Sequence, residues 1–170
     1  DETFALGCAI PFGLNSRQMT AWMYEGNGMK LMREFYAKLS IVNFPGGNTG
    51  AQMGGWYRKE IKTVADMKGL KVRVMQSPMA LASFNAMGMN AVPMAFPEVY
   101  PALETRALDG YEHPVVDMYA NKMFEVQKYL TITNHVYTPV ALVASKKWWS
   151  SLTPDQQKAV QKVAEDTRAF

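Results

Sequence analysis

The sequence predicts a mixed α/β fold built around a parallel or mixed β-sheet. From Thr63 onward, short apolar runs typical of strands alternate with segments that carry helix-start and helix-end residues, as in α/β proteins. The composition agrees, because 170 residues with 48% hydrophobic and 19% charged side chains can bury a sizeable core. In such sheets ligands bind at the carboxyl ends of the strands, so polar residues at those ends are the first candidates for a site.

The first third of the chain carries the fewest local signals. Residues 4–12 are apolar and end near a proline, which predicts a strand that enters a turn. Residues 29–39 repeat large apolar side chains at helical spacing and predict a helix. Residues 41–44 predict a short strand that the following proline stops, and the glycine-rich segment 46–55 comes next.

The remaining elements follow from capping residues and periodicity. Thr63, Ser77 and Thr153 are suited to the N-cap and predict helix starts, whereas Gly69 and Gly88 predict helix ends. Apolar alternation predicts the strands between them. The expected strands cover residues 70–74, 91–94, 108–112 and 130–145. The expected helices cover residues 63–68, 77–87, 117–129 and 153–170, and one more begins at Pro97.

The composition excludes several classes of protein. The net charge is only +3 and no run of Lys or Arg concentrates it, so a nucleic-acid-binding surface is not expected. Cys8 is the only cysteine, which excludes an internal disulfide and cysteine-based zinc or iron–sulfur sites. The most apolar stretch, residues 136–144, is too short to span a membrane. The chain begins with Asp1, and its last predicted helix reaches Phe170 without a stop signal, so we expect a fragment cut inside a helix.

The glycine-rich segment 46–55 is the first candidate for ligand binding. It lacks the Lys-Ser/Thr ending of a phosphate loop. Gln52 stands between its glycines and Trp56 follows them directly, so the backbone could approach a ligand closely while Gln52 presents its amide. The alternative interpretation is a flexible connector.

Arg73 is the second candidate, because it falls near the carboxyl end of the strand over residues 70–74. Strand alternation places Lys71 and Arg73 on one face and the apolar residues on the other. A guanidinium at that position can hold a carboxylate with two parallel hydrogen bonds. The alternative interpretation is a solvated charge at the edge of the sheet.

Glu112 and His113 end the strand over residues 108–112 and reach the same rim of the sheet. Glu112 could ligate a hard cation through oxygen, together with an amide such as Gln52, and an ordinary exposed glutamate is the alternative. The sequence contains no G-x-S-x-G, no H-E-x-x-H and no second carboxylate beside Glu112, so no catalytic residue is predicted.

An ordered series of segments carries a resemblance to one family. The segments are GGNTGAQMGGWYRKE (46–60), MKGLKVRV (67–74), EVYPALE (98–104), FEVQKYL (124–130), TNH (133–135) and LTPDQQ (152–157). Together they resemble the solute-binding proteins of tripartite ATP-independent periplasmic (TRAP) transporters, the DctP family. The resemblance covers essentially all 170 residues, and the glycine-rich segment is most similar to the branch that binds 2-oxo and 2-hydroxy monocarboxylates with a bound cation.

The resemblance implies a role for each candidate residue. Arg73 matches the family arginine that pairs with the substrate carboxylate. Gln52 matches a glutamine that contacts both cation and ligand, Glu112 matches a carboxylate that ligates the cation, and Trp56 is grouped with the substrate-binding residues. His113 stands where the oxo-acid branch has tryptophan and the dicarboxylate and sialic-acid branches have asparagine. It is therefore counted with both the ligand and the Na⁺ or Ca²⁺ site, through its side chain or its backbone carbonyl, and the exact acid stays open.

The resemblance also implies a two-lobed α/β fold like that of periplasmic binding proteins, of the TRAP solute-receptor type and incomplete at both ends. Residues 1–49 would be part of lobe I, and residues 50–138 would form lobe II with the ligand-binding residues. Residues 139–170 would be a crossover strand and helix that return toward lobe I.

The function that the resemblance implies is the capture of an organic acid in the periplasm for transmembrane uptake. The acid would be a 2-oxo or 2-hydroxy monocarboxylate such as pyruvate or lactate, or a dicarboxylate. The partners would be the membrane subunits of a TRAP transporter and, in the full-length protein, a second copy in a homodimer, and no reaction would be catalysed. The alternatives are the effector-binding domain of a transcriptional regulator and a metal-dependent enzyme that acts on a small acid.

Overall fold

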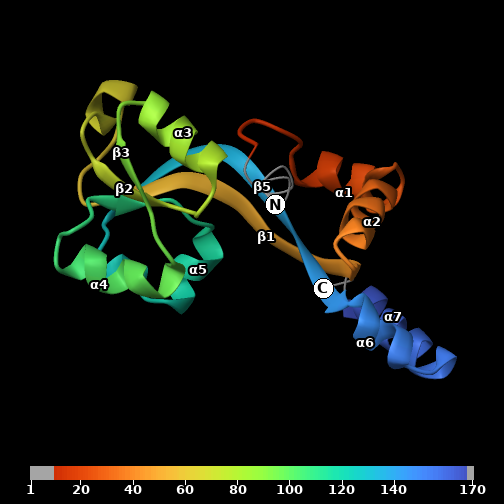
Figure 1. The fold of residues 1–170 in the computed structure, drawn as a ribbon. Coiled ribbons are helices and arrows are strands. Elements are labelled where there is room, and N and C mark those ends of the chain that lie inside the picture. The colour runs from red at the N-terminus through yellow and green to blue at the C-terminus, as the bar shows by residue number, and fades with distance from the viewer. Residues whose placement is uncertain (1–9, 168–170) are drawn as a thin grey trace. The chain divides into compact units, whose positions relative to one another are not determined.

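The structure is a computed structural model that describes residues 10–167, with the side chains of residues 52–54 also left undescribed. This part of the chain divides into two compact units (Figure 1). The first unit contains residues 10–13 and Gly50–Thr138, and the second contains Leu14–Thr49 and residues 139–167. The assignment of these segments to the lobes of a whole receptor stays a prediction.

A five-stranded sheet has the strand order β3-β2-β4-β1-β5. Strand β2 pairs in parallel with both β3 and β4, whereas β4 pairs antiparallel with β1. The sheet is therefore mixed, which confirms the predicted fold class. The strands are β1 (Ile41–Tyr57), β2 (Lys71–Val74), β3 (Asn90–Pro93), β4 (Gly110–Tyr111) and β5 (Tyr129–Ser145). Strands β1 and β5 each contain residues of both units.

Short helices cover the two faces of the sheet in the first unit. In Figure 1, α3 (Pro78–Ala86) lies above the strands, and α4 (Val99–Glu104) and α5 (Val115–Ala120) lie below them. The 3₁₀ turns are η2 (Val64–Met67), η3 (Phe96–Glu98) and η4 (Met123–Glu125). The predicted start of α3 is confirmed, because the Ser77 side chain accepts a hydrogen bond from the backbone N–H of Ala80.

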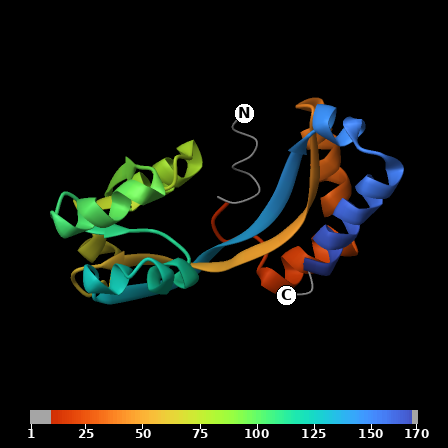
Figure 2. The ribbon, with the colours of Figure 1, turned by 90° about the horizontal axis from the view of Figure 1, so that it is seen from below.

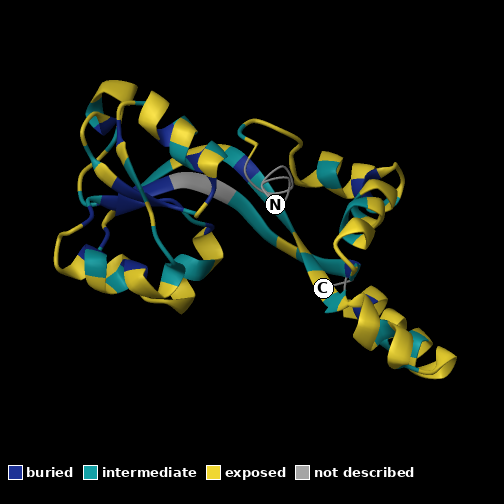
Figure 3. Ribbon diagram, in the orientation of Figure 1, coloured by how far each residue is buried: buried dark blue, intermediate teal, exposed yellow. Residues whose placement is uncertain are grey.

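Strand alternation divides the core of this unit between the two faces. Trp56 and Tyr57 are neighbours in β1 and both are buried, yet they belong to different apolar clusters. The cluster with α3 contains Tyr57, Met67, Val72, Val74, Ala80, Phe84 and Met89. The cluster with α4 contains Trp56, Val99, Leu103, Leu108, Tyr111 and Met123. Figure 3 shows the resulting concentration of buried residues along the strands of this unit.

In the second unit, helices lie on one side of the residues of β1 and β5 that belong to this unit (Figure 2). Phe44 of β1 packs on Trp149, with ring centroids 5.1 Å apart. Helix α1 was not predicted, although Asn15 and Gln18 form a capping box that indicates its start. Helix α6 was not predicted either. The helices are α1 (Ser16–Tyr24), α2 (Gly28–Lys38), α6 (Lys146–Ser151) and α7 (Pro154–Thr167).

The prediction that a strand stops at Pro45 is wrong, because β1 continues through the glycine-rich segment to Tyr57. The alternative of a flexible connector is wrong for the same reason. A side chain at Gly46 would meet backbone atoms of β5 at 3.2 Å, so glycine allows the two strands to approach closely there.

The predicted helix over residues 117–129 is also wrong. The chain forms α5, then a break, then η4, because Lys122 adopts a left-handed conformation with φ 54°. The predicted strand over residues 4–12 lies mostly outside the described part, and residues 11–12 form a turn.

Candidate functional site

Arg73 lies in the interior of the first unit, with only 5% of its surface exposed. In β2 it is paired with Val92 of β3 and Tyr111 of β4, and the exposed neighbour Lys71 begins the strand. The interpretation of Arg73 as a solvated edge charge is therefore wrong. Burial lowers the pKa of the guanidinium, and the negative charge of Glu112 opposes that shift.

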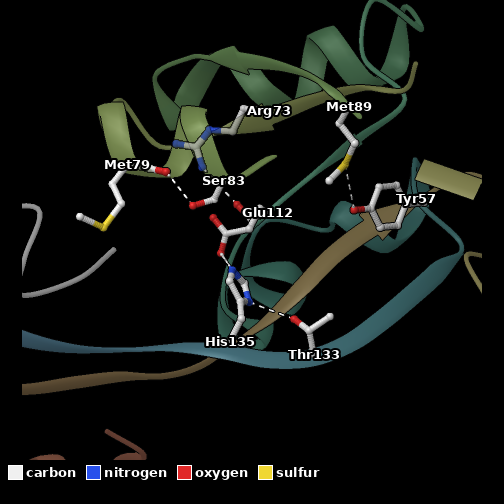
Figure 4. Close-up of polar contacts among 8 residues, drawn as sticks. All are labelled: Tyr57, Arg73, Met79, Ser83, Met89, Glu112, Thr133 and His135. Carbon is white, nitrogen blue, oxygen red and sulfur yellow. Dashed lines mark hydrogen bonds and ion pairs between the residues drawn. The ribbon is translucent and has the colours of Figure 1, made fainter. Parts of the chain in front are cut away.

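Two backbone carbonyls orient the Arg73 guanidinium. Nε donates to the carbonyl of Met94 at 2.9 Å. Nη1 donates to the carbonyl of Glu112 at 3.3 Å (Figure 4). The guanidinium carbon lies 5.8 Å from the ring centroid of Phe96. A guanidinium carries five N–H donors, so this arrangement fixes the plane of the group and leaves donors for an anion.

His113 lies beside the same phenylalanine. Its ring stacks on Phe96 with centroids 4.2 Å apart and an interplanar angle of 15°. Its Nε2 atom lies 2.8 Å from Oδ2 of Asp117, which lies in the first turn of α5. Burial lowers the pKa of His113, and Asp117 opposes the shift. The structure therefore brings Arg73 and His113 together around Phe96.

The side chain of Glu112 has different neighbours from the side chain of His113. It is 2% exposed, and its Oε1 atom lies 3.8 Å from Nε2 of His135 (Figure 4). Burial raises the pKa of Glu112 to about 7, although the positive charge of Arg73 opposes the shift. The alternative of an ordinary exposed glutamate is therefore wrong. Burial raises the pKa of Tyr57 to about 12, and the negative charge of Glu112 makes a smaller contribution in the same direction.

A cavity of about 280 Å³ borders Glu112 and His135. Most of its wall is apolar, and the polar side chains of Ser83 and Thr133 complete it. Thr133 lies 3.0 Å from Nδ1 of His135, and Ser83 donates to the backbone carbonyl of Met79 at 2.8 Å. The apolar wall comprises Pro11, Phe12, Met67, Met75, Ala80, Phe84, Met87, Met89 and Val136, with the ring of Tyr57.

The chemistry of Glu112 fits a cation ligand. Its Oε1 is buried and makes no hydrogen bond to the described residues, and Nε2 of His135 at 3.8 Å is its nearest charged partner. A buried carboxylate oxygen without a hydrogen bond is costly unless a donor or cation satisfies it. Across residues 10–167, however, no three or more His, Cys, Asp or Glu side chains gather as a metal site. A cation at Glu112 would therefore need amide or carbonyl oxygens as further ligands, and the side chain of Gln52 lies outside the described part.

The structure places the other predicted residues as follows. Trp56 is 6% exposed and lies in the core beside Tyr111, with no hydrogen-bond partner for its Nε1 in the described chain. His113 has its Nε2 engaged by Asp117, which leaves Nδ1 or the backbone carbonyl for any other contact. Sequence reasoning did not assign a role to Phe96, Asp117 or His135. The spacing of Asp117 four residues after His113 was the one local signal available.

Comparison with known proteins identifies the family. The model of the bacterial extracellular solute-binding proteins, family 7 (DctP), matches residues 1–170. The chain belongs to this family. The predicted resemblance is confirmed, and the DctP family consists of solute-binding transport proteins rather than enzymes.

Two individual periplasmic binding proteins are similar to this chain. The chain is 45% identical over 109 residues to the 2,3-diketo-L-gulonate-binding periplasmic protein YiaO of Escherichia coli, covering 64% of this chain and 33% of that protein. It is 43% identical over 108 residues to the monocarboxylate 2-oxoacid-binding periplasmic protein all3028 of Nostoc, covering 64% and 29%.

A solved structure of a TRAP solute-binding protein matches the whole chain. It is a TRAP periplasmic solute-binding protein of Pseudoalteromonas atlantica with bound sodium and pyruvate, which is 35% identical with a TM-score of 0.84. The match covers 100% of this chain and 51% of the other, so the chain spans about half the length of that protein. The α/β fold of TRAP solute-binding proteins is thereby confirmed. Among the helices of residues 10–167, none is both long and apolar enough to cross a bilayer.

Proposed function

We propose that this chain is part of a periplasmic solute-binding protein of a TRAP transporter that captures a 2-oxo or 2-hydroxy monocarboxylate for uptake. The observation that carries the proposal is the buried, oriented guanidinium of Arg73. A buried cation with free donors is a strong site for a carboxylate, because the interaction is little screened by solvent. The relatives named above bind a diketo acid and 2-oxo acids, and this supports the same class of ligand here.

The same proposal includes a bound cation. Glu112 would supply a carboxylate oxygen to a hard ion such as Na⁺ or Ca²⁺, with Gln52 and the backbone at residue 113 as further oxygen donors. The buried Oε1 of Glu112, which makes no hydrogen bond to the described residues, supports this assignment, as does the sodium bound with pyruvate in the related structure. Such an ion would neutralise the buried carboxylate and add positive charge beside a bound acid.

We also propose how the chain fits into the full-length protein and the transporter. Residues 1–49 and 139–170 would contribute to lobe I of the full-length protein and residues 50–138 to lobe II. The loaded protein would deliver its acid to the membrane subunits of the transporter, and the full-length protein would form a homodimer. Residues 14–49 and residues 139–167 fall in one compact unit, which supports this division in part.

The experiment is titration calorimetry with the full-length protein. Pyruvate, lactate, succinate and galacturonate are titrated in sodium buffer and again with choline in place of sodium. We expect a monocarboxylate to bind most tightly and to lose affinity when sodium is removed. Equal or tighter binding of succinate or galacturonate would contradict the monocarboxylate assignment, and unchanged affinity in choline would contradict a bound sodium.

A further inference from the structure

The hydrogen bonds of Arg73 determine which side of its guanidinium can hold an acid. Nε carries one hydrogen, and this hydrogen goes to the carbonyl of Met94 at 2.9 Å. Nη1 uses one of its two hydrogens for the carbonyl of Glu112 at 3.3 Å. Because Nε is occupied, a carboxylate that forms two parallel hydrogen bonds must meet the end of the group where Nη1 and Nη2 lie.

These two hydrogen bonds leave one motion of the guanidinium weakly restrained. Hydrogen bonds to carbonyl oxygens tolerate a broad range of angles, so they resist a tilt of the planar group only slightly. A contact on the face of the group restricts that tilt, and Phe96 supplies it. The guanidinium carbon lies 5.8 Å from the centroid of the Phe96 ring, within the range of a cation–π attraction. The segment that follows β3 therefore contacts Arg73 twice, through the Met94 carbonyl and the Phe96 ring.

The ring of Phe96 is itself held in place. The imidazole of His113 stacks on it, with centroids 4.2 Å apart and an interplanar angle of 15°. Phe96 also packs against the apolar cluster that includes α4. It begins η3, and the fixed φ of Pro97 restricts the backbone directly after it. Phe96 is therefore a firm support for the cation that lies over it.

We propose that Phe96 is a positioning residue that holds the Arg73 guanidinium with its Nη1 and Nη2 hydrogens directed at the carboxylate of the bound acid. Phe96 acts through Arg73 and does not have to touch the acid. A guanidinium is planar, so a tilt breaks its two-bond grip, whereas a lysine ammonium is a point charge with no plane to orient. The inference rests on the proposed function and adds to the site a residue that controls how tightly the acid is held.

The first test measures the affinity of the full-length protein for pyruvate and lactate by titration calorimetry. Phe96→Leu keeps an apolar side chain and removes the ring, so the affinity should fall by about two- to thirtyfold. Phe96→Tyr keeps the face of the ring and should bind as the wild type does. The matched control is Phe124→Leu, because Phe124 is also partly exposed but packs on the ring of Tyr119, with centroids 6.1 Å apart. This control should also bind as the wild type does.

A double-mutant cycle separates positioning from a purely structural role. Phe96→Leu is combined with Arg73→Lys, whose ammonium has no plane for Phe96 to orient. In the Arg73→Lys background we expect Phe96→Leu to cost less than about twofold in affinity, well below its cost in the wild type. A residue that only shapes the site would cost the same in both backgrounds.

The second test needs no variant, so it decides the question even where Phe96→Leu does not fold. Proton NMR of the unliganded full-length protein measures nuclear Overhauser contacts between the ring of Phe96 and the guanidinium of Arg73. We expect these contacts to be present before any acid binds. Their absence would overturn the proposal.

The binding measurements distinguish failure of the inference from failure of the proposed function. Unchanged affinity in Phe96→Leu would overturn the inference alone, and so would an equal loss in Phe124→Leu or in the Arg73→Lys background. A wild-type protein that binds neither acid would overturn the proposed monocarboxylate function and this inference with it.

Discussion

Replacing Arg73 with alanine tests the central element of the proposed site. The substitution removes the guanidinium that Met94 and Glu112 orient through their carbonyls at 2.9 and 3.3 Å. It removes at the same time the donors available to a bound carboxylate. Two effects are therefore expected, one on the affinity for the acid and one on the stability of the protein without ligand.

The size of each effect follows from the number of contacts. A hydrogen bond to a charged group contributes about 1.5–3 kcal/mol, so losing a two-bond pair with a carboxylate would cost about 3–6 kcal/mol, or roughly 10²- to 10⁴-fold in affinity. Arg73→Lys keeps the charge and loses the forked geometry, so its affinity should lie between those of Arg73→Ala and wild type. In the unliganded protein, the substitution leaves two carbonyl oxygens without their donor, but it also removes the cost of burying the charge of Arg73. The net loss in free energy of unfolding should be about 1–3 kcal/mol.

The assay is titration calorimetry with lactate and pyruvate, together with thermal melts in the absence of ligand. Lys71→Ala is the matched control, because it removes an exposed positive charge two residues earlier in the same strand. The control should bind as wild type does. Wild-type affinity in Arg73→Ala, or an equal loss in Lys71→Ala, would remove Arg73 from the binding site.

The remaining predictions concern Glu112 and the backbone. Burial raises the pKa of Glu112 from 4.5 to about 7, so the protonated carboxyl stabilises the fold below pH 4.5 and that stabilisation is lost as the pH rises through 7. In buffer without added cation, the free energy of unfolding of Glu112→Gln at pH 8 should therefore exceed that of the wild type by up to about 3 kcal/mol. Denaturant titrations in which Glu112→Gln shows the same pH dependence of stability as the wild type would refute this. In the full-length protein, Glu112→Gln should also weaken acid binding and abolish its dependence on Na⁺ or Ca²⁺, and calorimetry that finds both unchanged would exclude Glu112 as a cation ligand. Lys122→Gly should stabilise the protein by about 1 kcal/mol, because Lys122 adopts a left-handed backbone conformation with φ 54° that favours glycine. Gly69→Ala should destabilise the protein, because Gly69 has φ 78°. Thermal melts that show no difference from wild type would contradict the left-handed conformation at these two residues.

The sequence alone was sufficient for some of the local features of the fold. Alternation and capping predicted β2, β3 and α3 close to their observed bounds, because these elements depend on residues near one another in the chain. The same alternation placed Arg73 on the face opposite Val72 and Val74, and the structure buries the apolar pair in the cluster with α3. The ordered segments were enough to indicate the family, which the match to residues 1–170 then confirmed.

Other features depended on contacts between distant segments, and these only the tertiary structure decided. Strand β1 continues through a glycine-rich segment that local propensity assigned to a loop, because β5 approaches it closely at Gly46. Glu112 and His113 are adjacent in sequence and were predicted to share one rim, yet one faces His135 and the other stacks on Phe96. Side chains of successive residues in an extended chain point in opposite directions, and the partner that each one meets is fixed by packing rather than by the sequence around it.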